Sequence, residues 1–342
     1  MSLLPKSNKT KPLLSVENLN TFFFTTRGVV KAVNNVSFTL KAGETLGVLG
    51  ESGSGKSVMA LSILRLVQGP AGKIVDGKIF LDGRDLLKIS EGQMREYRGK
   101  IISMILQDPL TSLNPVFTIG KQVAESVRIH RFGEGSIRDQ IFDLLKRVGI
   151  SDPETRMNAY PHQFSGGMRQ RVMIAMALIT RPEILIADEP STALDVTVQK
   201  QVLDLLHERQ KALGLSIILI THDMGSVAEM AERVVVMYAG RKIEEGDVTD
   251  ILSRPRHPYT RGLIACVPHL LDTVTSERPY LQEVPGMVPP LADFGFDGCM
   301  FVPRCDLAGE SCWQEKPDMI QLTKSQSAAC WNLQEAKVLV DA

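Results

Sequence analysis

The stretch GESGSGKS, residues 50–57, overlaps the end of the apolar run TLGVLG (45–50) and precedes a second run, VMALSILRLV (58–67). These runs predict a short buried strand before the loop and a buried helix after it. Glycines let the loop backbone curl so that successive N–H groups face one anion, and the N-terminus of the following helix adds positive potential. A glycine-rich surface turn is the alternative, but the flanking strand and helix disfavour it. The stretch therefore predicts a phosphate-binding loop.

The loop also carries the residue types that a nucleotide requires. It matches the pattern G-x-x-x-x-G-K-[S/T], in which Lys56 would neutralise the β- and γ-phosphates and the Ser57 hydroxyl would bind Mg²⁺. The other residues expected to surround the phosphates are Gly50, Glu51, Ser52, Gly53, Ser54 and Gly55. We therefore expect a nucleotide and Mg²⁺ at this loop.

Length and composition suit a globular protein. The chain has 342 residues, 44% hydrophobic and 23% charged, which is enough for about two domains. The formal net charge is zero, so no general affinity for nucleic acid is implied. The apolar runs are far shorter than the roughly 18 residues that span a bilayer, and the N-terminus lacks the apolar core of a signal peptide. We expect a flexible tail at 1–12 and a soluble cytoplasmic protein.

An acidic pair ends another apolar strand, ILIADEP (184–190). Asp188 would hold Mg²⁺ through water, and Glu189 would polarise the water that attacks the nucleotide. A strand that ends in a solvated acidic turn is the alternative. Beside a glycine-rich phosphate loop, the catalytic interpretation is favoured.

Three more polar residues lie at or beyond the ends of apolar segments. Gln107 closes ISMILQ (102–107), His222 follows IILIT (217–221), and Asp195 lies six residues past Glu189. Strands alternating with helices predict a mostly parallel sheet with helices on both faces, and ligands bind at the carboxyl ends of such strands. Gln107 would sense Mg²⁺ and the attacking water, and His222 would contact the γ-phosphate. A purely structural role is the alternative for the histidine.

A second anion site is predicted at FSGGMRQR, residues 164–171, which opens the apolar helix VMIAMALI (172–179). Ser165, Gly166 and Gly167 would lie at the N-terminus of that helix, where anions bind. Two copies facing head to tail would use both sites, because the serine-glycine turn of each chain would cap the nucleotide of the other. An ordinary N-cap serine followed by packing glycines is the alternative.

In this order, the motifs resemble the ATP-binding-cassette ATPases over residues 13 to about 255. The resemblance implies an α/β fold of the P-loop NTPase class, with a mostly parallel sheet, an antiparallel N-terminal β subdomain and a helical signature subdomain at about 110–175. It identifies the following motifs: the Walker A loop (50–57), the Q-loop residue Gln107, the signature (165–170), Walker B with its catalytic glutamate (Asp188 and Glu189), the D-loop (192–195) and the switch histidine His222.

Two positions of this chain fit the family pattern less closely than the motifs do. Met168 stands where many relatives have glutamine, but Ser165 and the backbone carry the phosphate contacts, so little loss is expected. The family also places an aromatic residue under the adenine. Phe23 matches best, although its neighbours Phe22 and Phe24 blur the assignment and all three could instead belong to the core.

Narrower clues point to one branch of the family. QDPLTSLNP (107–115), DEPSTALDVTVQ (188–199) and HPYTRGL (257–263) resemble the dipeptide and oligopeptide import ATPases, including their nickel and glutathione relatives. The composition changes beyond about 255, and residues 256–342 resemble the C-terminal extension of this branch. The resemblance therefore covers nearly the whole chain.

Four cysteines crowd into the extension: Cys299, Cys305, Cys312 and Cys330. Four thiolates suit either a [4Fe–4S] cluster or Zn²⁺. The C-x5-C-x6-C-x17-C spacing lacks the close cysteine pairs typical of zinc sites and so favours a cluster, as does the family resemblance. Zinc is the second interpretation and four reduced thiols the third. In any of these cases the expected role is structural.

The resemblance implies an ATP-hydrolysing subunit of an importer for di- or oligopeptides, with nickel or glutathione as alternative cargo. Its implied partners are two transmembrane permease subunits, a second and paralogous ATPase subunit in a heterodimer, and indirectly a substrate-binding protein. No nucleic acid is expected. The chain would lie peripherally on the cytoplasmic face of the inner membrane. A soluble cassette ATPase acting on DNA or ribosomes is a more distant alternative, disfavoured because the sequence has neither a second cassette nor a charge excess.

Overall fold

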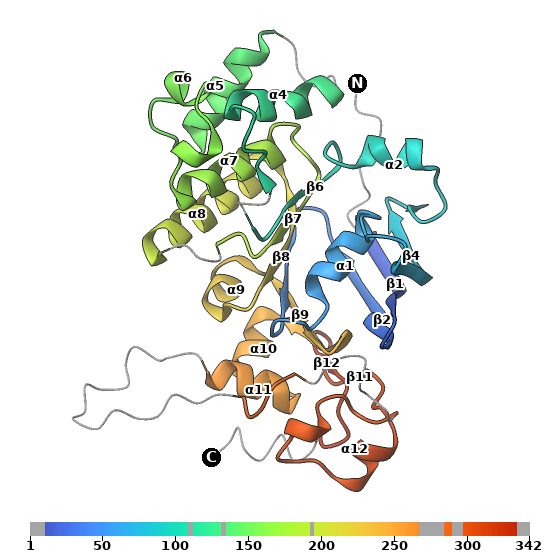
Figure 1. The fold of residues 1–342 in the computed structure, drawn as a ribbon. Helices are drawn as coiled ribbons and strands as arrows, with labels where there is room; N and C mark the ends of the chain where they lie inside the picture. The colour runs from blue at the N-terminus through green and yellow to red at the C-terminus, as the bar shows by residue number, and fades with distance from the viewer. Residues whose placement is uncertain are drawn as a thin grey trace, which may run out of the picture. The chain divides into compact units, whose positions relative to one another are not determined.

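The structure is a computed structural model that describes residues 11–108, 112–130, 135–191, 195–266, 284–288 and 297–333. Figure 1 labels the helices and strands, and the chain divides into two compact units. Unit 1 consists of the residues up to 14, residues 40–45 and residues 81–220, and unit 2 consists of residues 15–39, residues 46–80 and the residues from 221 onward. Residues 1–10 of the expected tail lie outside the described residues.

Unit 1 is built around a parallel sheet. Its elements are β5 (Arg84–Asp85), α2 (Glu91–Tyr97), β6 (Ile102–Ile105), α4 (Ile119–His130), α5 (Ile137–Arg147), α6 (Pro153–Arg156), the 3₁₀ helix η1 (Pro161–Gln163), α7 (Gly166–Leu178), β7 (Ile184–Asp188), α8 (Val196–Leu213) and β8 (Ser216–Thr221). Strand β7 pairs in parallel with β6 on one side and with β8 on the other. Every residue of β7 and β8 is buried, as is typical of parallel strands covered on both faces.

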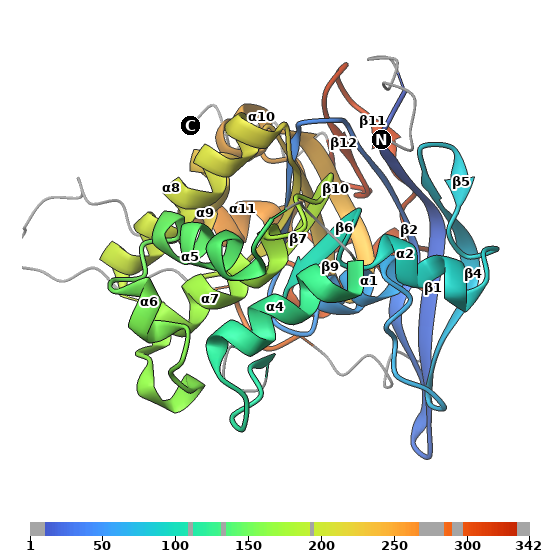
Figure 2. The same cartoon turned by 90° about the horizontal axis from the view of Figure 1, so that it is seen from above.

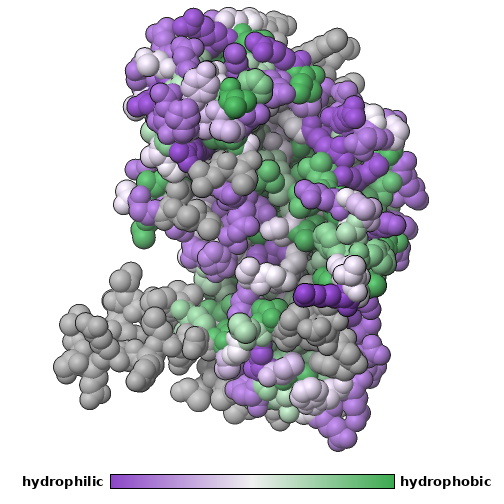
Figure 3. All heavy atoms as spheres, viewed as in Figure 1, coloured by the Kyte–Doolittle hydropathy of each residue, from purple (hydrophilic) through white to green (hydrophobic). Residues whose placement is uncertain are grey.

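Helices α4, α5 and α7 pack against one another in unit 1, and α7 also contacts β6 (Figure 2). Helix α5 begins after its N-cap Ser136, whose hydroxyl accepts the backbone N–H of Asp139 at 3.4 Å. The outward surface of these helices is mostly hydrophilic, with apolar patches between (Figure 3). Among the described residues, no helix combines the length and apolar character that crossing a bilayer requires.

Unit 2 holds two sheets. Its elements are β1 (Leu14–Thr25), β2 (Gly28–Leu40), β3 (Thr45–Leu49), α1 (Lys56–Ile63), β4 (Gly72–Leu81), α9 (Met224–Met230), β9 (Arg233–Tyr238), β10 (Arg241–Asp247), α10 (Val248–Ser253), α11 (Pro258–Ala265), the 3₁₀ helix η2 (Val302–Arg304), α12 (Glu310–Gln314), β11 (Ile320–Gln321) and β12 (Ser327–Ala328). In the first sheet, β1 lies between β2 and β4. In the second, β3 pairs in parallel with β9, and β10 pairs antiparallel with both β9 and β12.

The helix after the phosphate loop is shorter than the sequence predicts. The apolar run continues to residue 67, but α1 ends at Ile63. The backbone of Arg65 has a φ of 53°, in the left-handed region that an α-helix does not use. The apolar side chains beyond Ile63 therefore lie outside the helix although they continue its pattern.

Strand β12, from the C-terminal extension, extends the second sheet of unit 2, and a buried carboxylate secures this part of the fold. Glu244 on β10 has no exposed surface. Its Oε1 accepts the N–H of Arg256 at 2.8 Å and the side-chain amide of Gln326 at 3.0 Å, and its Oε2 accepts the N–H of His257 at 2.9 Å. All three donors bind the same carboxylate. Glu244 therefore fixes the start of α11 and the strand region of the extension to one point of the sheet.

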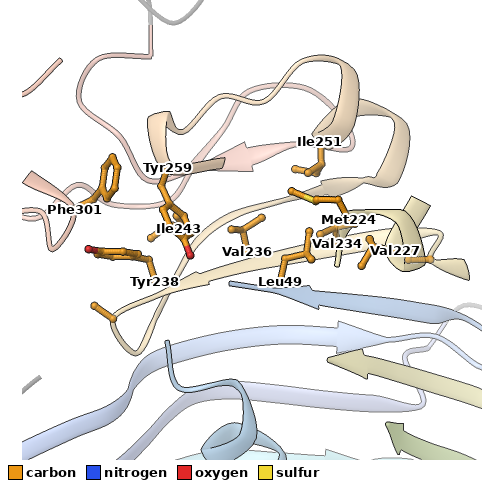
Figure 4. Close-up of a cluster of buried hydrophobic side chains, with 12 residues drawn as sticks. Leu49, Met224, Val227, Val234, Val236, Tyr238, Ile243, Ile251, Tyr259 and Phe301 are labelled. Atoms are coloured by element: carbon orange, nitrogen blue, oxygen red, sulfur yellow. The ribbon is translucent and has the colours of Figure 1, made fainter. Parts of the chain in front are cut away.

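The apolar core of this region contains Leu49, Val234 and Val236 from the parallel strands (Figure 4). At one end of the cluster, Tyr238, Tyr259 and Phe301 pack edge to face, with ring centroids 4.7 to 5.4 Å apart. Such pairs contribute about 1 kcal/mol each beyond the area they bury. The aromatic group therefore joins β9, α11 and the cysteine-bearing extension.

Candidate nucleotide-binding site

The phosphate loop follows β3 in unit 2 as the sequence predicts, and its glycines are sterically required at two positions. A Cβ at Gly50, where φ is 153°, would lie 2.3 Å from the carbonyl oxygen of Met237. A Cβ at Gly55, where φ is 98°, would lie 2.2 Å from the carbonyl oxygen of Ala32. No side chain fits at such distances, so the tight curl of the loop depends on these two glycines.

The loop closes around the side chain of Lys56, which is only 5% exposed. Its ammonium donates to the carbonyl oxygens of Gly50 at 2.6 Å and Glu51 at 2.9 Å, and to the Ser54 hydroxyl at 3.3 Å. Helix α1 then begins at Lys56 with no side-chain cap and no acidic residue in its first turn. A buried cation and an uncapped helix N-terminus thus lie together, which is the arrangement that binds a phosphate. Ser57, expected to bind Mg²⁺, follows in the first turn of α1 and is half-buried.

Two residues that sequence reasoning missed hold the loop from outside. The guanidinium of Arg304, in η2, donates to both carboxylate oxygens of Glu51, at 2.6 and 3.0 Å. The hydroxyl of Tyr259, at the start of α11, accepts the Glu51 backbone N–H at 2.8 Å. Tyr259 belongs to the HPY motif and Arg304 precedes Cys305, but neither position carries a local signal that it contacts the loop. The contact joins residues 253 positions apart.

The acidic pair lies at the end of β7 in unit 1, also as expected. Asp188 is 3% exposed, and Glu189 follows with its N–H donated to the carbonyl oxygen of Ile220 at 2.8 Å. Gln107 lies beyond the end of β6, and its side-chain amide donates to the Glu189 carboxylate at 2.9 Å. Glu189 has a φ of 48°, a conformation that non-glycine residues adopt rarely and mostly at functional sites. The structure therefore brings Gln107 and Glu189 together, although they are 82 positions apart.

The predicted serine-glycine turn begins α7 in unit 1. The Ser165 hydroxyl accepts the N–H of Met168 at 3.3 Å, so this serine is an N-cap. A Cβ at Gly167 would lie 2.9 Å from Val198, whereas one at Gly166 would meet nothing within 4 Å. Asp195 caps α8 in the same way, accepting the Val198 N–H at 2.9 Å. The other residues of the expected D-loop, 192–194, lie outside the described residues.

His222 follows β8 and is exposed, and in sequence it belongs to unit 2 with the phosphate loop. The next residue, Asp223, caps α9 by accepting the N–H groups of Gly225 and Ser226, each at 3.0 Å. Burial would raise the pKa of Asp223, but the hydrogen bonds from Ser226 and Gly225 outweigh it and hold the pKa below its usual range. The sequence assigned no role to Asp223, which fixes the helix beside the histidine.

The three aromatic residues of β1 lie on alternate faces of the strand. Phe22 and Phe24 each have a lysine ammonium within 6 Å of the ring centroid, at 5.9 and 5.8 Å. Phe23 is half-buried and packs against Gly72 of β4, where an added Cβ would lie 2.8 Å from its ring. The role of Phe23 beneath adenine stays a prediction.

The four cysteines of the extension line one small cavity in unit 2, which His257 and Phe301 also line. Burial raises the pKa of the Cys299 and Cys330 thiols to about 11. No disulfide joins them. In the described part of the chain, no three cysteine, histidine or acidic side chains are close enough to hold a metal ion.

Two family models match the chain. Residues 33–192 match the model described as ABC transporter, and residues 243–312 match the model described as oligopeptide/dipeptide transporter, C-terminal region. Two solved structures share the fold. "Dimeric Structure of MJ0796, a Bacterial ABC Transporter Cassette" is 27% identical with a TM-score of 0.62, and covers 69% of this chain and 98% of that one. The structure of cbiO1 from Clostridium perfringens is 30% identical with a TM-score of 0.59, and covers 70% and 90%.

Several relatives match over nearly their full length. A probable peptide ABC transporter ATP-binding protein, y4tR of Sinorhizobium fredii, is 49% identical over 96% of this chain and 97% of its own. The dipeptide transport ATP-binding protein DppD of Escherichia coli is 44% identical over 93% and 96%, and the oligopeptide transport ATP-binding protein AppD of Bacillus subtilis is 45% identical over 94% and 97%. With both family models matched and the phosphate loop and acidic strand in place, this chain belongs to the family of peptide ABC transporter ATP-binding proteins.

Proposed function

We propose that this chain hydrolyses ATP to energise the import of di- or oligopeptides across the cytoplasmic membrane. The observation that carries the hydrolytic part is the hydrogen bond between Gln107 and Glu189, which orients a carboxylate at the end of a buried strand. The names of the relatives support peptides as cargo. Nickel or glutathione is the alternative cargo, because the selective path lies in other subunits.

In this proposal, residues of this chain supply the chemical roles that ATP hydrolysis requires. Lys56 binds the β- and γ-phosphates, and Glu189 accepts a proton from the attacking water while Gln107 orients that carboxylate. The Ser57 hydroxyl, the Asp188 carboxylate and the Gln107 amide oxygen are hard oxygen donors, which fit Mg²⁺. Bound Mg²⁺ would neutralise phosphate charge. His222 contacts the γ-phosphate in this proposal.

The serine-glycine turn serves the nucleotide of a second ATPase chain in this proposal. Ser165 caps α7, whose first turn has no acidic residue, and Gly166 has open space around it. An anion could therefore approach this helix N-terminus without meeting a side chain. The partner would be a paralogous subunit in a heterodimer, with each chain completing the site of the other.

Permease subunits would dock on the helical part of unit 1. Val116 and Phe117, just before α4, are 70% and 49% exposed, although both are large and apolar. Exposed apolar side chains mark sites of protein contact when they lie together. In this proposal the chain lies at the cytoplasmic face of the inner membrane through the permeases bound to this surface. An apolar docking surface of this kind supports the importer over a soluble ATPase acting on DNA or ribosomes.

The test is affinity purification of the tagged chain from detergent-solubilised membranes. We expect two membrane-spanning chains and a second ATPase to co-purify. The double variant Val116→Glu/Phe117→Glu should lose most of the membrane chains, because two charges would enter an apolar contact at about 2 kcal/mol or more each, while ATP binding persists. Uptake of labelled dipeptide, nickel or glutathione by a complemented deletion strain then identifies the cargo.

Val29→Glu is the matched control, because Val29 is an exposed valine in unit 2, on β2, and its variant should retain the membrane chains. Recovery of ribosomes or DNA in place of permeases would refute the importer. If the double variant retains all of its membrane partners, the proposed docking surface is wrong, although the importer proposal stands.

We further propose that the four cysteines hold a [4Fe–4S] cluster with a structural role. The four residues line one cavity, and cysteine thiolates are the usual ligands of such clusters. The C-x5-C-x6-C-x17-C spacing lacks the close cysteine pairs typical of zinc sites, and this favours a cluster over zinc. The cluster would stabilise an extension that has few apolar residues.

Purification without air should give a brown protein that absorbs near 400 nm and carries about four irons per chain, as clusters do. Cys330→Ser should lose the colour and lower the melting temperature of unit 2. Cys266→Ser is the control, because Cys266 does not line the cavity, and it should keep both. A colourless protein that contains zinc would contradict the cluster and support the second interpretation.

A further inference from the structure

The C-terminal extension holds the phosphate loop at Glu51, by an ion pair to its carboxylate and a hydrogen bond to its backbone N–H. Glu51, the second residue of the loop, projects its side chain toward Arg304 rather than toward the cation of the loop itself. The Arg304 side chain is 3% exposed and the Glu51 side chain 29% exposed. The ion pair is bidentate, which fixes the orientation of both groups.

Arg304 itself has little freedom. Its Nε donates to the carbonyl oxygen of Pro285 at 2.6 Å, and one terminal nitrogen also donates to that of Val284 at 3.2 Å. The Tyr238 hydroxyl accepts from the other terminal nitrogen at 3.4 Å. The Arg304 guanidinium is therefore held in place by several partners besides Glu51, so it forms a rigid anchor for the loop.

The backbone of Glu51 is also hydrogen-bonded to the loop lysine and to the extension. Its carbonyl oxygen accepts a hydrogen bond from Lys56, and its N–H donates to Tyr259. The residue that pairs with Arg304 is therefore also in direct contact with the lysine expected to bind phosphate. The carboxylate is also an anion within a loop that receives anions, so its charge opposes ATP unless a cation offsets it.

We propose that Arg304 is a positioning residue for ATP: it anchors the phosphate loop and neutralises Glu51, so that the C-terminal extension sets the affinity of the loop for nucleotide. This inference rests on nucleotide binding by the loop. It does not depend on the imported substrate or on the iron–sulfur cluster.

A double-mutant cycle on the full-length chain tests the proposal, with a fluorescent ATP analogue at equilibrium as the probe. Arg304→Met should weaken binding about tenfold, because it leaves the Glu51 charge unpaired beside the phosphates. Adding Glu51→Gln to that variant should restore binding to within about threefold of wild type, since the opposing charge is gone. Glu51→Gln alone should bind about threefold more tightly, because Arg304 then attracts phosphate without opposition.

Rescue by the second substitution separates this role from a merely structural one, because a second mutation in a damaged fold would not restore affinity. Arg254→Met is the matched control. Arg254 forms an ion pair with Asp250 on the surface of the same unit, and its variant should bind as wild type does. Steady-state hydrolysis should show a raised KM for ATP with kcat within about twofold of wild type.

Binding that is unchanged in Arg304→Met overturns the proposal, as does weakened binding that Glu51→Gln fails to restore. If Arg304→Met is insoluble, Arg304→Lys carries the same test. Lysine keeps the charge but not the bidentate geometry, so about threefold weaker binding is expected, again restored by Glu51→Gln. If the wild-type protein binds no nucleotide, the proposed ATPase function is wrong. If the wild type binds nucleotide and the Arg304 variant binds it equally well, only this inference is refuted.

Discussion

Glu189→Gln is expected to lower ATP hydrolysis about 100- to 1,000-fold, because a positioned general base contributes at least that much to the rate. The substitution keeps the length of the side chain and its ability to interact with Gln107, so the loop should stay folded. ATP binding should persist, and with the second ATPase subunit present, chains locked on uncleaved ATP should accumulate as heterodimers. Phosphate release measures the rate, and size-exclusion chromatography with ATP measures the dimer.

Glu183→Gln is the matched control for this result. Glu183 immediately precedes β7, at the opposite end of the strand from Glu189, and its side chain is exposed. Its variant should hydrolyse ATP at the wild-type rate. Unchanged hydrolysis in Glu189→Gln would remove Glu189 from the role of base, and loss of ATP binding would show that its effect is structural.

The strands could be predicted because burial and local chemistry agree there. TLGVL and SIILIT are mostly apolar, and both are completely buried as β3 and β8. The end of helix α1 was harder to predict, because no local sequence pattern marks it. Nothing in the run VMALSILRLV indicates that the backbone turns left-handed at Arg65, since the apolar pattern continues past it. Helix ends without glycine or proline carry weak signals.

The part of the candidate site that lies at the carboxyl ends of the parallel strands could be predicted from the sequence. Parallel strands place their carboxyl ends on one edge, so Gln107 and Glu189 could be expected to meet, and they do. The approach of Arg304 to Glu51 follows from the packing of the extension on β9 and β10, which no spacing encodes. The aromatic residue under adenine could not be identified either. The side chains of Phe22 to Phe24 alternate between the two faces of β1, and the sequence does not show which face binds a ligand.

Lys56→Ala is expected to weaken ATP binding about a hundredfold, because hydrogen bonds from a cation to a charged ligand contribute up to about 3 kcal/mol. The lysine is buried and already bound to the loop carbonyls of Gly50 and Glu51. Its loss therefore removes both the phosphate partner and the donor that holds the loop closed. Calorimetric titration with ATP and Mg²⁺ measures the effect, and hydrolysis should fall in parallel.

Two further variants show which of these contributions dominates. Lys56→Gln retains an N–H donor for the loop carbonyls but carries no charge, so it should keep the melting temperature of the wild type and still bind ATP poorly. Lys41→Ala removes an exposed lysine and should change neither quantity. If Lys56→Gln binds ATP as tightly as the wild type, the ammonium charge is not what attracts the phosphates, and the helix N-terminus with its surrounding N–H groups must be sufficient on its own.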